Sequence, residues 1–330
     1  MSQIFAEGTG LIDNINAERF EEIALAMFLY QYRNNILYQQ FTDALHIKLE
    51  AVTSLEAIPF LPISFFKTHR VVTGNWTTPE LTFESSGTTG EVTSKHFVRD
   101  AALYEASLQK GFEQFYGPVK NYAVLALLPS YLERSNASLV HMARRLMAGS
   151  GHPDCGFYLN EWGKLSEVLL RLQQAGQPVI LLGVTFALLD FAEAYPMNLS
   201  HTIVMETGGM KGRRKEWTRA QVHQYLQQQW QLLAVHSEYG MTELLSQAYA
   251  LKDGIFQPAV TMKVLVRDLN DPLTTAAAGT GCINVIDLAN RDSCAFIATE
   301  DIARLQADGC FEVLGRMDHS ALRGCSLMTI

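Results

Sequence analysis

Apolar side chains recur with a helical period in the first part of the chain. Between residues 12 and 50 they stand at i, i+3, i+4 and i+7 spacing, with acidic residues near the start. This spacing gathers apolar groups on one face of a helix, so the pattern predicts helices in this region. The next stretch, 58–71, contains two prolines and a dense set of aromatic residues, which indicates a buried connector.

Short apolar runs alternate with amphipathic segments through the middle of the chain. The pattern predicts strands at 81–84, 95–98, 123–129, 178–184, 201–209 and 232–243, the last two running into turns. It predicts helices that begin near Asp100, a favourable N-cap, and at 135–149, 164–177, 185–196 and 218–231. Strands that alternate with helices form parallel sheets with helices on their faces, so an α/β fold is expected.

The pattern changes to strand and turn from about Gly254 onward. Apolar runs at 255–269, 279–288, 294–305 and 310–316 predict a β-rich region. We therefore divide the chain into an N-terminal helical region, an α/β core, a β-rich subdomain of the same core and a C-terminal tail. The predicted boundaries are 1–57, 58–253, 254–315 and 316–330.

Composition and charge argue against several function classes. With 330 residues, 48% of them hydrophobic and 18% charged, the sequence is typical of a globular protein. A net charge of −8 argues against nucleic-acid binding, which depends on neutralising phosphates. The longest apolar run, 179–189, is shorter than the roughly 20 residues that span a bilayer, and the N-terminus lacks the pattern of a secretion signal. Five cysteines without a CxxC pair favour reduced thiols, so we expect a cytoplasmic protein with no membrane insertion.

A loop rich in glycine and hydroxyl groups follows the first predicted strand. Six of the seven residues at 85–91 are Ser, Thr or Gly, and Lys95 stands just downstream. Backbone N–H groups, hydroxyls and a lysine in such a turn can donate hydrogen bonds to a phosphate. The Walker A pattern does not fit, because Val92 stands where that pattern requires glycine. A surface hairpin rich in Ser and Thr is the alternative that the loop alone leaves open.

Four segments, taken in order, give the loop a more specific meaning. SSGTTG with its downstream lysine resembles the phosphate loop of the adenylate-forming superfamily of acyl-CoA synthetases and related ligases. YGMTE at 239–243, TED at 299–301 and GRMD at 315–318 resemble the YGxTE, TGD and GRxD motifs of that superfamily. From about residue 58 onward, the chain resembles the acyl-protein synthetases typified by the LuxE component of bacterial fatty-acid reductases. The segments that carry this resemblance are IPFLPISFFKTH, FESSGTTG, LALLPSYLERSNASLVHM, TGGMKGRR, HSEYGMTELLSQAY and LRGCSL.

The resemblance implies a fold as well as a function. It implies the large N-terminal adenylation domain of the acyl-CoA synthetase-like fold, with mixed sheets flanked by helices and a β-rich subdomain. The hinge is expected to be truncated and the mobile C-terminal domain absent, because the sequence stops twelve residues after Asp318. Near the nucleotide the sequence departs from the superfamily pattern, since Val92 and Thr93 replace a proline and a lysine and Glu300 replaces a glycine.

The resemblance also assigns roles to individual residues. Nucleotide binding falls to Ser85, Ser86, Gly87, Thr88, Thr89, Gly90, Lys95, Gly208, Gly209, Tyr239, Asp301 and Arg316. The loop residues would hold the β- and γ-phosphates, Tyr239 would stack on adenine beside the two later glycines, and Asp301 with Arg316 would hold the ribose. As catalytic residues, Thr242 would contact the α-phosphate or the acyl carboxylate, and Glu243 would be the Mg²⁺ ligand.

The C-terminal segment LRGCSL implies a covalent acceptor, Cys325. ATP would convert a carboxylate to an acyl-adenylate, whose AMP leaves readily, and a thiolate would then capture the acyl group as a thioester. Arg323 would favour the thiolate form of this cysteine. An inert thiol is the alternative interpretation of a single cysteine near the end of the chain.

These features favour an ATP- and Mg²⁺-dependent acyl-protein synthetase as the leading hypothesis. The enzyme would adenylate a carboxylic acid, expected to be a fatty acid, load it on Cys325 and pass it to a partner such as an acyl reductase. Two alternatives remain open: a ligase that uses coenzyme A or a carrier thiol, and a non-catalytic nucleotide-binding subunit of a reductase complex.

Overall fold

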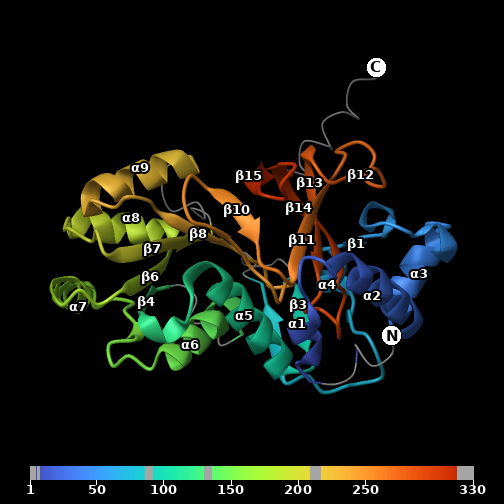
Figure 1. The fold of residues 1–330 in the computed structure, drawn as a ribbon, viewed down its shortest axis with the longest axis horizontal. Coiled ribbons are helices and arrows are strands. Elements are labelled where there is room, and N and C mark those ends of the chain that lie inside the picture. Colours follow the sequence, from blue (N-terminus) through green and yellow to red (C-terminus); the bar gives the residue numbers. More distant parts are fainter. Residues whose placement is uncertain (1–4, 6–7, 86–91, 130–135, 209–216, 318–330) are drawn as a thin grey trace.

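The computed structural model describes residues 5, 8–85, 92–129, 136–208 and 217–317. Within these ranges, thirteen strands form one continuous sheet, and two further strands form a separate hairpin. The strand order in the sheet is β12-β11-β13-β14-β15-β10-β9-β8-β7-β6-β4-β5, and β1 pairs with β14 off this path. Figure 1 shows a parallel half on the left and an antiparallel half on the right.

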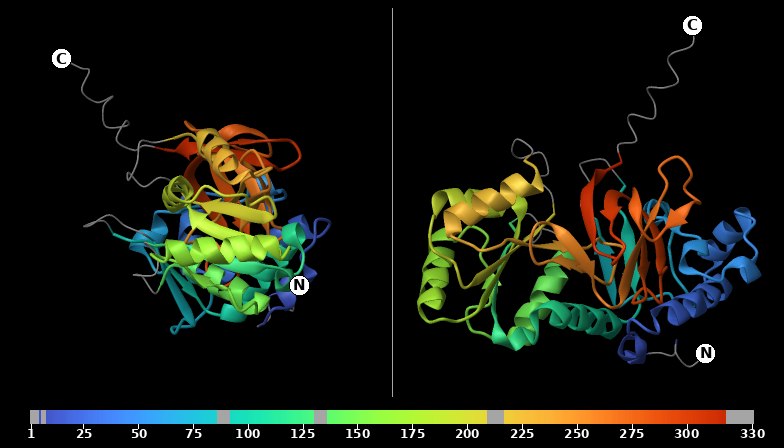
Figure 2. Two further views of the ribbon diagram at one scale, coloured as in Figure 1. Left: turned by 90° about the vertical axis from the view of Figure 1, so that its left-hand side faces the viewer. Right: turned by 45° about the horizontal axis from the view of Figure 1, so that its top comes forward.

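The left half of the sheet is parallel and covered by helices. Its strands are β4 (Ala123–Leu127), β5 (Gly156–Phe157), β6 (Val179–Val184), β7 (Thr202–Thr207) and β8 (His236–Tyr239). Its helices are α5 (Ala101–Tyr116), α6 (Ser138–Ser150), α7 (Trp162–Gln174), α8 (Thr185–Ala194) and α9 (Arg219–Trp230). Helices α8 and α9 lie on one side of the strands and α5 and α6 on the other (Figures 1 and 2). Strands β4 and β6 are accordingly buried along their whole length, as expected for strands with helices on both faces.

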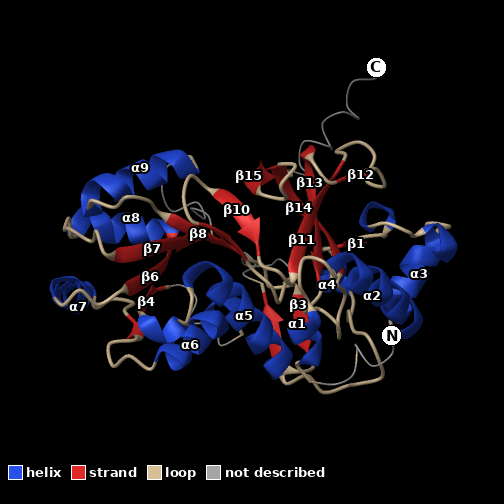
Figure 3. Ribbon diagram, in the orientation of Figure 1, coloured by secondary structure: helices blue, strands red, loops and turns tan. Residues whose placement is uncertain are grey.

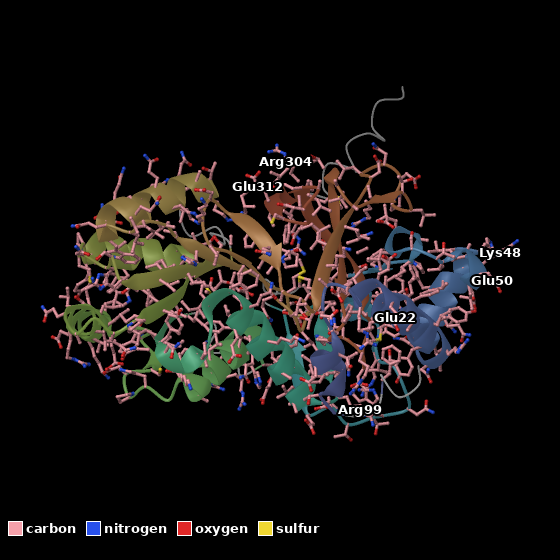
Figure 4. The ribbon with its side chains drawn as sticks, in the orientation of Figure 1. Glu22, Lys48, Glu50, Arg99, Arg304 and Glu312 are labelled. Carbon is pink, nitrogen blue, oxygen red and sulfur yellow. The ribbon has the colours of Figure 1, made fainter. Side chains whose placement is uncertain are left out.

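The right half of the sheet is antiparallel, apart from β1. Its strands are β1 (Leu61–Pro62), β9 (Ala248–Ala250), β10 (Ile255–Pro258), β11 (Met262–Arg267), β12 (Thr275–Ala276), β13 (Gly279–Asp287), β14 (Phe296–Leu305) and β15 (Phe311–Arg316). Strand β9 pairs antiparallel with β8 and so joins the two halves, and β10 links β9 to β15. On the solvent side of this half, Arg304 of β14 forms an exposed 3.4 Å ion pair with Glu312 of β15 (Figure 4).

The N-terminal helices pack beside the antiparallel half, away from the parallel strands (Figure 2). They are α1 (Gly10–Asn14), α2 (Phe20–Asn34), α3 (Ile36–Ala44) and the short 3-10 turns η1 (Leu49–Ala51) and η2 (Leu55–Ala57). The ring of Tyr38 stacks on that of Phe296 in β14, with centroids 5.9 Å apart, and Phe28 meets the same ring edge-on at 6.5 Å. Aromatic packing therefore anchors this region to the sheet.

A hairpin and a short helix complete the arrangement. Strands β2 (Leu81–Glu84) and β3 (Lys95–Val98) pair antiparallel, with Glu84 opposite Lys95, and they flank residues 86–91 in the sequence. Helix α4 (Phe65–Thr68) follows β1 directly. A further 3-10 turn, η3 (Val119–Asn121), links α5 to β4.

The strands and helices predicted from the sequence are confirmed, and so is the α/β fold class. Asp100 caps α5 by accepting the backbone N–H of Leu103, as expected for an N-cap. The short strands β5, β9 and β12, and the pairing of β1 with β14, were not predicted. Among the described residues, none of the helices is both long and apolar enough to cross a membrane. The domain boundaries and the cytoplasmic location stay predictions.

Candidate active site

One cavity of about 510 Å³ lies where the two halves of the sheet meet. Its walls come from β2, β7, β8, β10, β14 and β15 and from helices α4, α5, α6 and α9. The parallel and antiparallel halves of the sheet meet at the centre of Figure 3. The residues with assigned roles that line it are Ser85, Gly208, Tyr239, Thr242, Glu243, Asp301 and Arg316. Segments more than 200 residues apart in the sequence therefore meet at one cavity.

Of the other residues with assigned roles, the structure describes Lys95 alone. Lys95 lies on β3 and is absent from the lining. Outside the described residues lie Ser86, Gly87, Thr88, Thr89, Gly90, Gly209 and Cys325. The roles assigned to all of these residues stay predictions.

Tyr239 ends β8 among aromatic rings from neighbouring strands. Its ring centroid is 5.8 Å from that of Phe256 and 5.5 Å from that of Phe311. Its hydroxyl donates to Asp301 Oδ2 at 3.0 Å, and burial raises the pKa of this tyrosine well above its usual value, so the proton stays in place. Arg316 Nε lies 3.9 Å from Asp301 Oδ1. The residues assigned to adenine and to ribose are thus in direct contact.

The ion pair between Arg219 and Glu206 forms the cavity wall next to Tyr239. Arg219 at the start of α9 pairs its Nε with Glu206 Oε1 at 3.2 Å and places its guanidinium 5.1 Å from the centroid of the Phe256 ring. Gly208 follows β7 with φ of 75°, a conformation that side chains disfavour, and its carbonyl accepts the Thr185 hydroxyl at 2.6 Å. This pairing of α9 with β7 was not predicted from the sequence.

Ser85 lies at the end of β2, where it closes the hairpin. Its backbone N–H donates to the Ser94 carbonyl at 3.0 Å, and its hydroxyl oxygen accepts the Ser94 N–H at 2.9 Å. A hydroxyl that accepts one hydrogen bond can still donate its own proton. Ser85 is therefore held in place and retains a donor for a ligand in the cavity.

Glu243 is 5% exposed and lines the cavity. Burial raises the pKa of its carboxyl, while a hydrogen bond with Ser94 and the positive charges of Arg316 and Lys67 act in the opposite direction. Its backbone carbonyl accepts the side-chain amide of Asn290 at 2.8 Å, which fixes this turn of the chain. Mg²⁺ beside a nucleotide is commonly held by one or two carboxylates together with phosphates and water, and Glu243 fits that pattern. The structure shows no group of three or more His, Cys, Asp and Glu side chains that could hold a metal ion within its described ranges.

His96 ties the hairpin to the segment that contains Thr242. Its Nδ1 donates to the Thr242 carbonyl at 2.9 Å, and its Nε2 lies 2.9 Å from the Ser293 hydroxyl. A carbonyl can only accept, so the proton of a neutral His96 is on Nδ1 and Ser293 donates to Nε2. Burial lowers the pKa of His96 to about 4. The ring is therefore a neutral structural link near neutral pH.

Acidification is expected to destabilise the protein through His96. Its pKa of about 4 lies below the 6.5 of the unfolded state, so between these values the unfolded chain binds more protons and stability falls as the pH drops. This histidine alone should cost about 2 kcal/mol of unfolding free energy at pH 5 relative to pH 8. Urea unfolding at both pH values should show this difference between the wild type and His96→Gln. A variant with the pH dependence of the wild type would contradict the assignment.

A lysine that lines the cavity was missed by the sequence analysis. Lys95 forms a 3.4 Å ion pair with Glu84 at the base of the hairpin, and its side chain is 53% exposed. Lys67 on α4 instead lines the cavity, and its charge acts on the carboxyl of Glu243. Phe66, the residue before it, is buried and meets the His96 ring edge-on at 5.6 Å. Lys67 is thus carried by a short helix that is packed against the site.

Two buried hydrogen-bond acceptors line the same cavity and were also missed. Glu238 on β8 is 8% exposed, and Gln247 just before β9 is 4% exposed. The Thr207 hydroxyl donates to Glu238 Oε2 at 2.6 Å. Burial raises the pKa of Glu238 to about 7. The hydrogen bond from Thr207 lowers this pKa, and the negative charge of Glu206 raises it. Neither residue belongs to a motif that predicts a cavity position for it.

Comparison with protein-family models finds no match, and no curated protein matches the chain. Solved structures do match. A 2-hydroxyisobutyryl-CoA ligase, in complex with 2-HIB-AMP and CoA, aligns with 92% of this chain and 78% of its own at a TM-score of 0.64 and 11% identity. MatB from Rhodopseudomonas palustris, with ATP bound, aligns with 74% of this chain at a TM-score of 0.53 and 17% identity. The long-chain-fatty-acid-CoA ligase FadD1 from Archaeoglobus fulgidus aligns with 78% of this chain and 56% of its own at a TM-score of 0.53 and 15% identity.

The chain has the α/β fold of the N-terminal domain of adenylate-forming ligases. It spans half the length of the MatB structure. At these identities the likeness shows the fold alone, so substrate, acceptor and partners are matters for proposal.

Proposed function

We propose that this protein adenylates a carboxylic acid with ATP and Mg²⁺ and transfers the acyl group to a thiol. The observation that carries the proposal is the convergence of Ser85, the segment 239–243, Asp301 and Arg316 on one cavity. Each of these positions comes from a different motif, and each motif is short enough to occur by chance. A shared cavity is expected only if the motifs serve one site.

The proposed chemistry follows from the reactivity of a carboxylate, which is anionic and lacks a good leaving group. Attack of its oxygen on the α-phosphorus of ATP forms an acyl-adenylate and releases pyrophosphate. Tyr239 would stack on adenine, while Asp301 would accept hydrogen bonds from the ribose hydroxyls and Arg316 would contact the ribose. The Thr242 hydroxyl would donate to the α-phosphate or the acyl carboxylate. Glu243 would hold Mg²⁺, which when bound neutralises charge that develops on the phosphates.

Lys67 would supply a positive charge to the same reaction. It lines the cavity with Glu243 and forms no ion pair with a carboxylate of the described residues. Lys95 is engaged with Glu84 at the hairpin base. A lysine side chain that no carboxylate of the described residues holds in an ion pair can follow charge as it moves from the acyl carboxylate to the phosphates. We therefore favour Lys67 over Lys95 for this role.

The acyl acceptor in the leading proposal is Cys325, with a fatty acid as substrate and an acyl reductase as the partner. The support is the sequence resemblance in LRGCSL. Transfer to free coenzyme A is the second candidate, and the CoA ligases among the matched structures favour it. The two candidates share the adenylation step and differ only in the thiol.

Acid-dependent exchange between ATP and labelled pyrophosphate tests the shared step. The protein is incubated with a pool of short, long and aromatic carboxylic acids, which is split to find the substrate if exchange occurs. Exchange that requires added acid supports adenylation. ATP binding without acid-dependent exchange would contradict the proposal and support the non-catalytic nucleotide-binding subunit.

Replacing Cys325 with Ser separates the two acceptors. We expect Cys325→Ser to abolish hydroxylamine-sensitive acylation of the protein and to leave acid-dependent pyrophosphate exchange intact, because the thiol enters only after the adenylate forms. Labelled acid with ATP, followed by gel analysis with and without hydroxylamine, measures this directly, and Cys310→Ser is the matched control. Thioester formation on free coenzyme A by the Cys325→Ser protein would favour the second candidate.

A further inference from the structure

The cavity contains two buried acceptors that the proposed nucleotide contacts leave unused. Gln247 Oε1 is shielded from solvent and has no hydrogen-bond partner among the described residues. Within the same part of the chain, Thr207 is the donor to Glu238, and it engages Oε2. A buried acceptor without a donor costs about 1–3 kcal/mol, so such a group in a cavity points to a ligand that supplies the donor.

Gly240 shows that the two acceptors are neighbours. A Cβ atom added to Gly240 would lie 2.5 Å from Glu238 Oε1 and 3.7 Å from Gln247 Cγ. The Glu238 carboxylate therefore occupies the space that a side chain at Gly240 would need, and Gln247 borders the same space. A side chain at Gly240 would have to displace the flexible end of the Glu238 side chain.

The acceptors face a different part of the cavity from the proposed nucleotide contacts. Successive side chains of a strand point to opposite faces, so Glu238 and Tyr239 of β8 point to opposite sides. Tyr239 packs against Phe256 and Phe311 and bonds Asp301. On the other side, burial and then the nearby charge of Glu238 raise the pKa of the Tyr104 hydroxyl on α5.

The walls around the acceptors are mixed in chemistry. Tyr104 of α5 and Leu139 and Met142 of α6 line the cavity on the helix side. Apolar side chains here suit an alkyl segment, and each buried methylene contributes about 0.8 kcal/mol. An unsubstituted alkyl chain would nevertheless cover Glu238 and Gln247 without offering a hydrogen-bond donor to either side chain.

We propose that this end of the cavity receives an acyl group that carries a hydrogen-bond donor, a hydroxyl or an amino group, and that Glu238 and Gln247 accept it. This inference rests on the proposed adenylation. Glu238 and Thr242, the residue proposed to contact the reacting carboxylate, line the same cavity, so one bound acid can present its carboxylate to Thr242 and its donor to Glu238. The substrate class is a hydroxy or amino carboxylic acid, and the fatty acid expected from the sequence becomes a hydroxylated or aminated one.

Matched acids test the inference. Acid-dependent pyrophosphate exchange is measured with series of equal chain length that are unsubstituted, hydroxylated or aminated at carbons 2 to 5. We expect kcat/KM to favour one substituted series by about 10- to 100-fold, the range expected for one hydrogen bond to a buried charged or polar group. The hydroxy and amino arms identify which donor the site takes.

Variants locate the preference at the acceptors. Glu238→Gln keeps the size of the side chain and an oxygen for the Thr207 bond, and Gln247→Leu removes the orphan oxygen. Each should reduce the ratio of kcat/KM for the substituted acid to that for the unsubstituted acid by about tenfold. Glu300→Gln is the matched control, because it removes a cavity carboxylate on β14, and it should leave that ratio unchanged whatever it does to the rate.

The outcomes separate this inference from the proposed function. Equal use of the unsubstituted acids by the wild type, or equal loss on all acids in Glu238→Gln, would overturn the inference while adenylation stands. If no acid supports exchange, calorimetry measures the binding of the same acids in the presence of a non-hydrolysable ATP analogue and so tests the inference without the reaction. Tighter binding of a substituted acid then supports the recognition site even though the proposed reaction fails, and the lack of any preference overturns it.

Discussion

Lys67→Gln is expected to lower kcat for acid-dependent pyrophosphate exchange by about 10²- to 10³-fold, the effect of removing one charge-stabilising donor from an active site. Lys67 lines the cavity with Glu243, and the two charges are close enough to influence each other. If the lysine stabilises charge that develops during attack on the α-phosphorus, kcat falls more than KM rises. Steady-state kinetics at varied ATP and acid separate these two effects.

Lys95→Gln is the matched control for this prediction. It removes the same charge from a lysine that is paired with Glu84 and lies outside the cavity lining, so kcat should change little. Lys67→Arg should recover part of the lost rate, because the positive charge is restored with a different geometry. The assignment fails if Lys95→Gln shows the larger loss or if Lys67→Gln changes only KM.

The sequence predicts those candidate site residues that belong to short local motifs. Tyr239, Thr242 and Glu243 stand within five consecutive positions, and the resemblance assigns them to one nucleotide site together with Asp301 and Arg316. The structure brings these residues to one cavity, with Tyr239 bonded to Asp301. The order of the motifs predicts a shared site because the motifs lie at or near the ends of strands, and one sheet brings these strand ends together.

The position of Lys67 was not predictable by the same reasoning. The segment around it shows aromatic residues without a helical or strand period, so the pattern predicts a buried connector, and the resemblance of IPFLPISFFKTH assigns no role to its lysine. Its place depends on β1 pairing with β14, which joins Leu61 to Ile297, and on Phe66 packing against His96. Contacts between residues so far apart in the sequence leave no local signal.

The acceptor pair was missed for a related reason. Glu238 is one polar position in the strand that the sequence predicts over 232–243, and the resemblance of HSEYGMTELLSQAY assigns no role to Glu238 or Gln247. Both residues are buried beside the cavity, and their side-chain oxygens have too few hydrogen-bond donors around them. Both properties depend on the packed fold. The strand pattern does predict that Glu238 and Tyr239 face opposite sides, but it does not predict that both sides border the cavity.

Asp287→Ala is expected to destabilise the protein by about 3–5 kcal/mol, because Asp287 holds the chain just after the proposed catalytic segment. Asp287 is fully buried. Its Oδ2 accepts the backbone N–H groups of Leu245 at 2.7 Å and Ser246 at 2.9 Å. Its Oδ1 accepts the Ser246 hydroxyl at 2.6 Å and the Ala289 N–H at 3.1 Å. Removal of the carboxylate would leave these buried donors without an acceptor.

Urea unfolding of Asp287→Ala measures the loss, and Asp271→Ala is the matched control. Asp271 also accepts a backbone N–H, from Leu273, and a hydroxyl, from Thr274, but its side chain lies at the surface, where water replaces the lost bonds. The control should therefore lose far less stability. Similar losses in the two variants would show that Asp287 does not fix this segment. A large loss in Asp287→Ala alone, with pyrophosphate exchange reduced even in the folded fraction, would show that the buried carboxylate also positions Thr242 and Glu243 for the reaction.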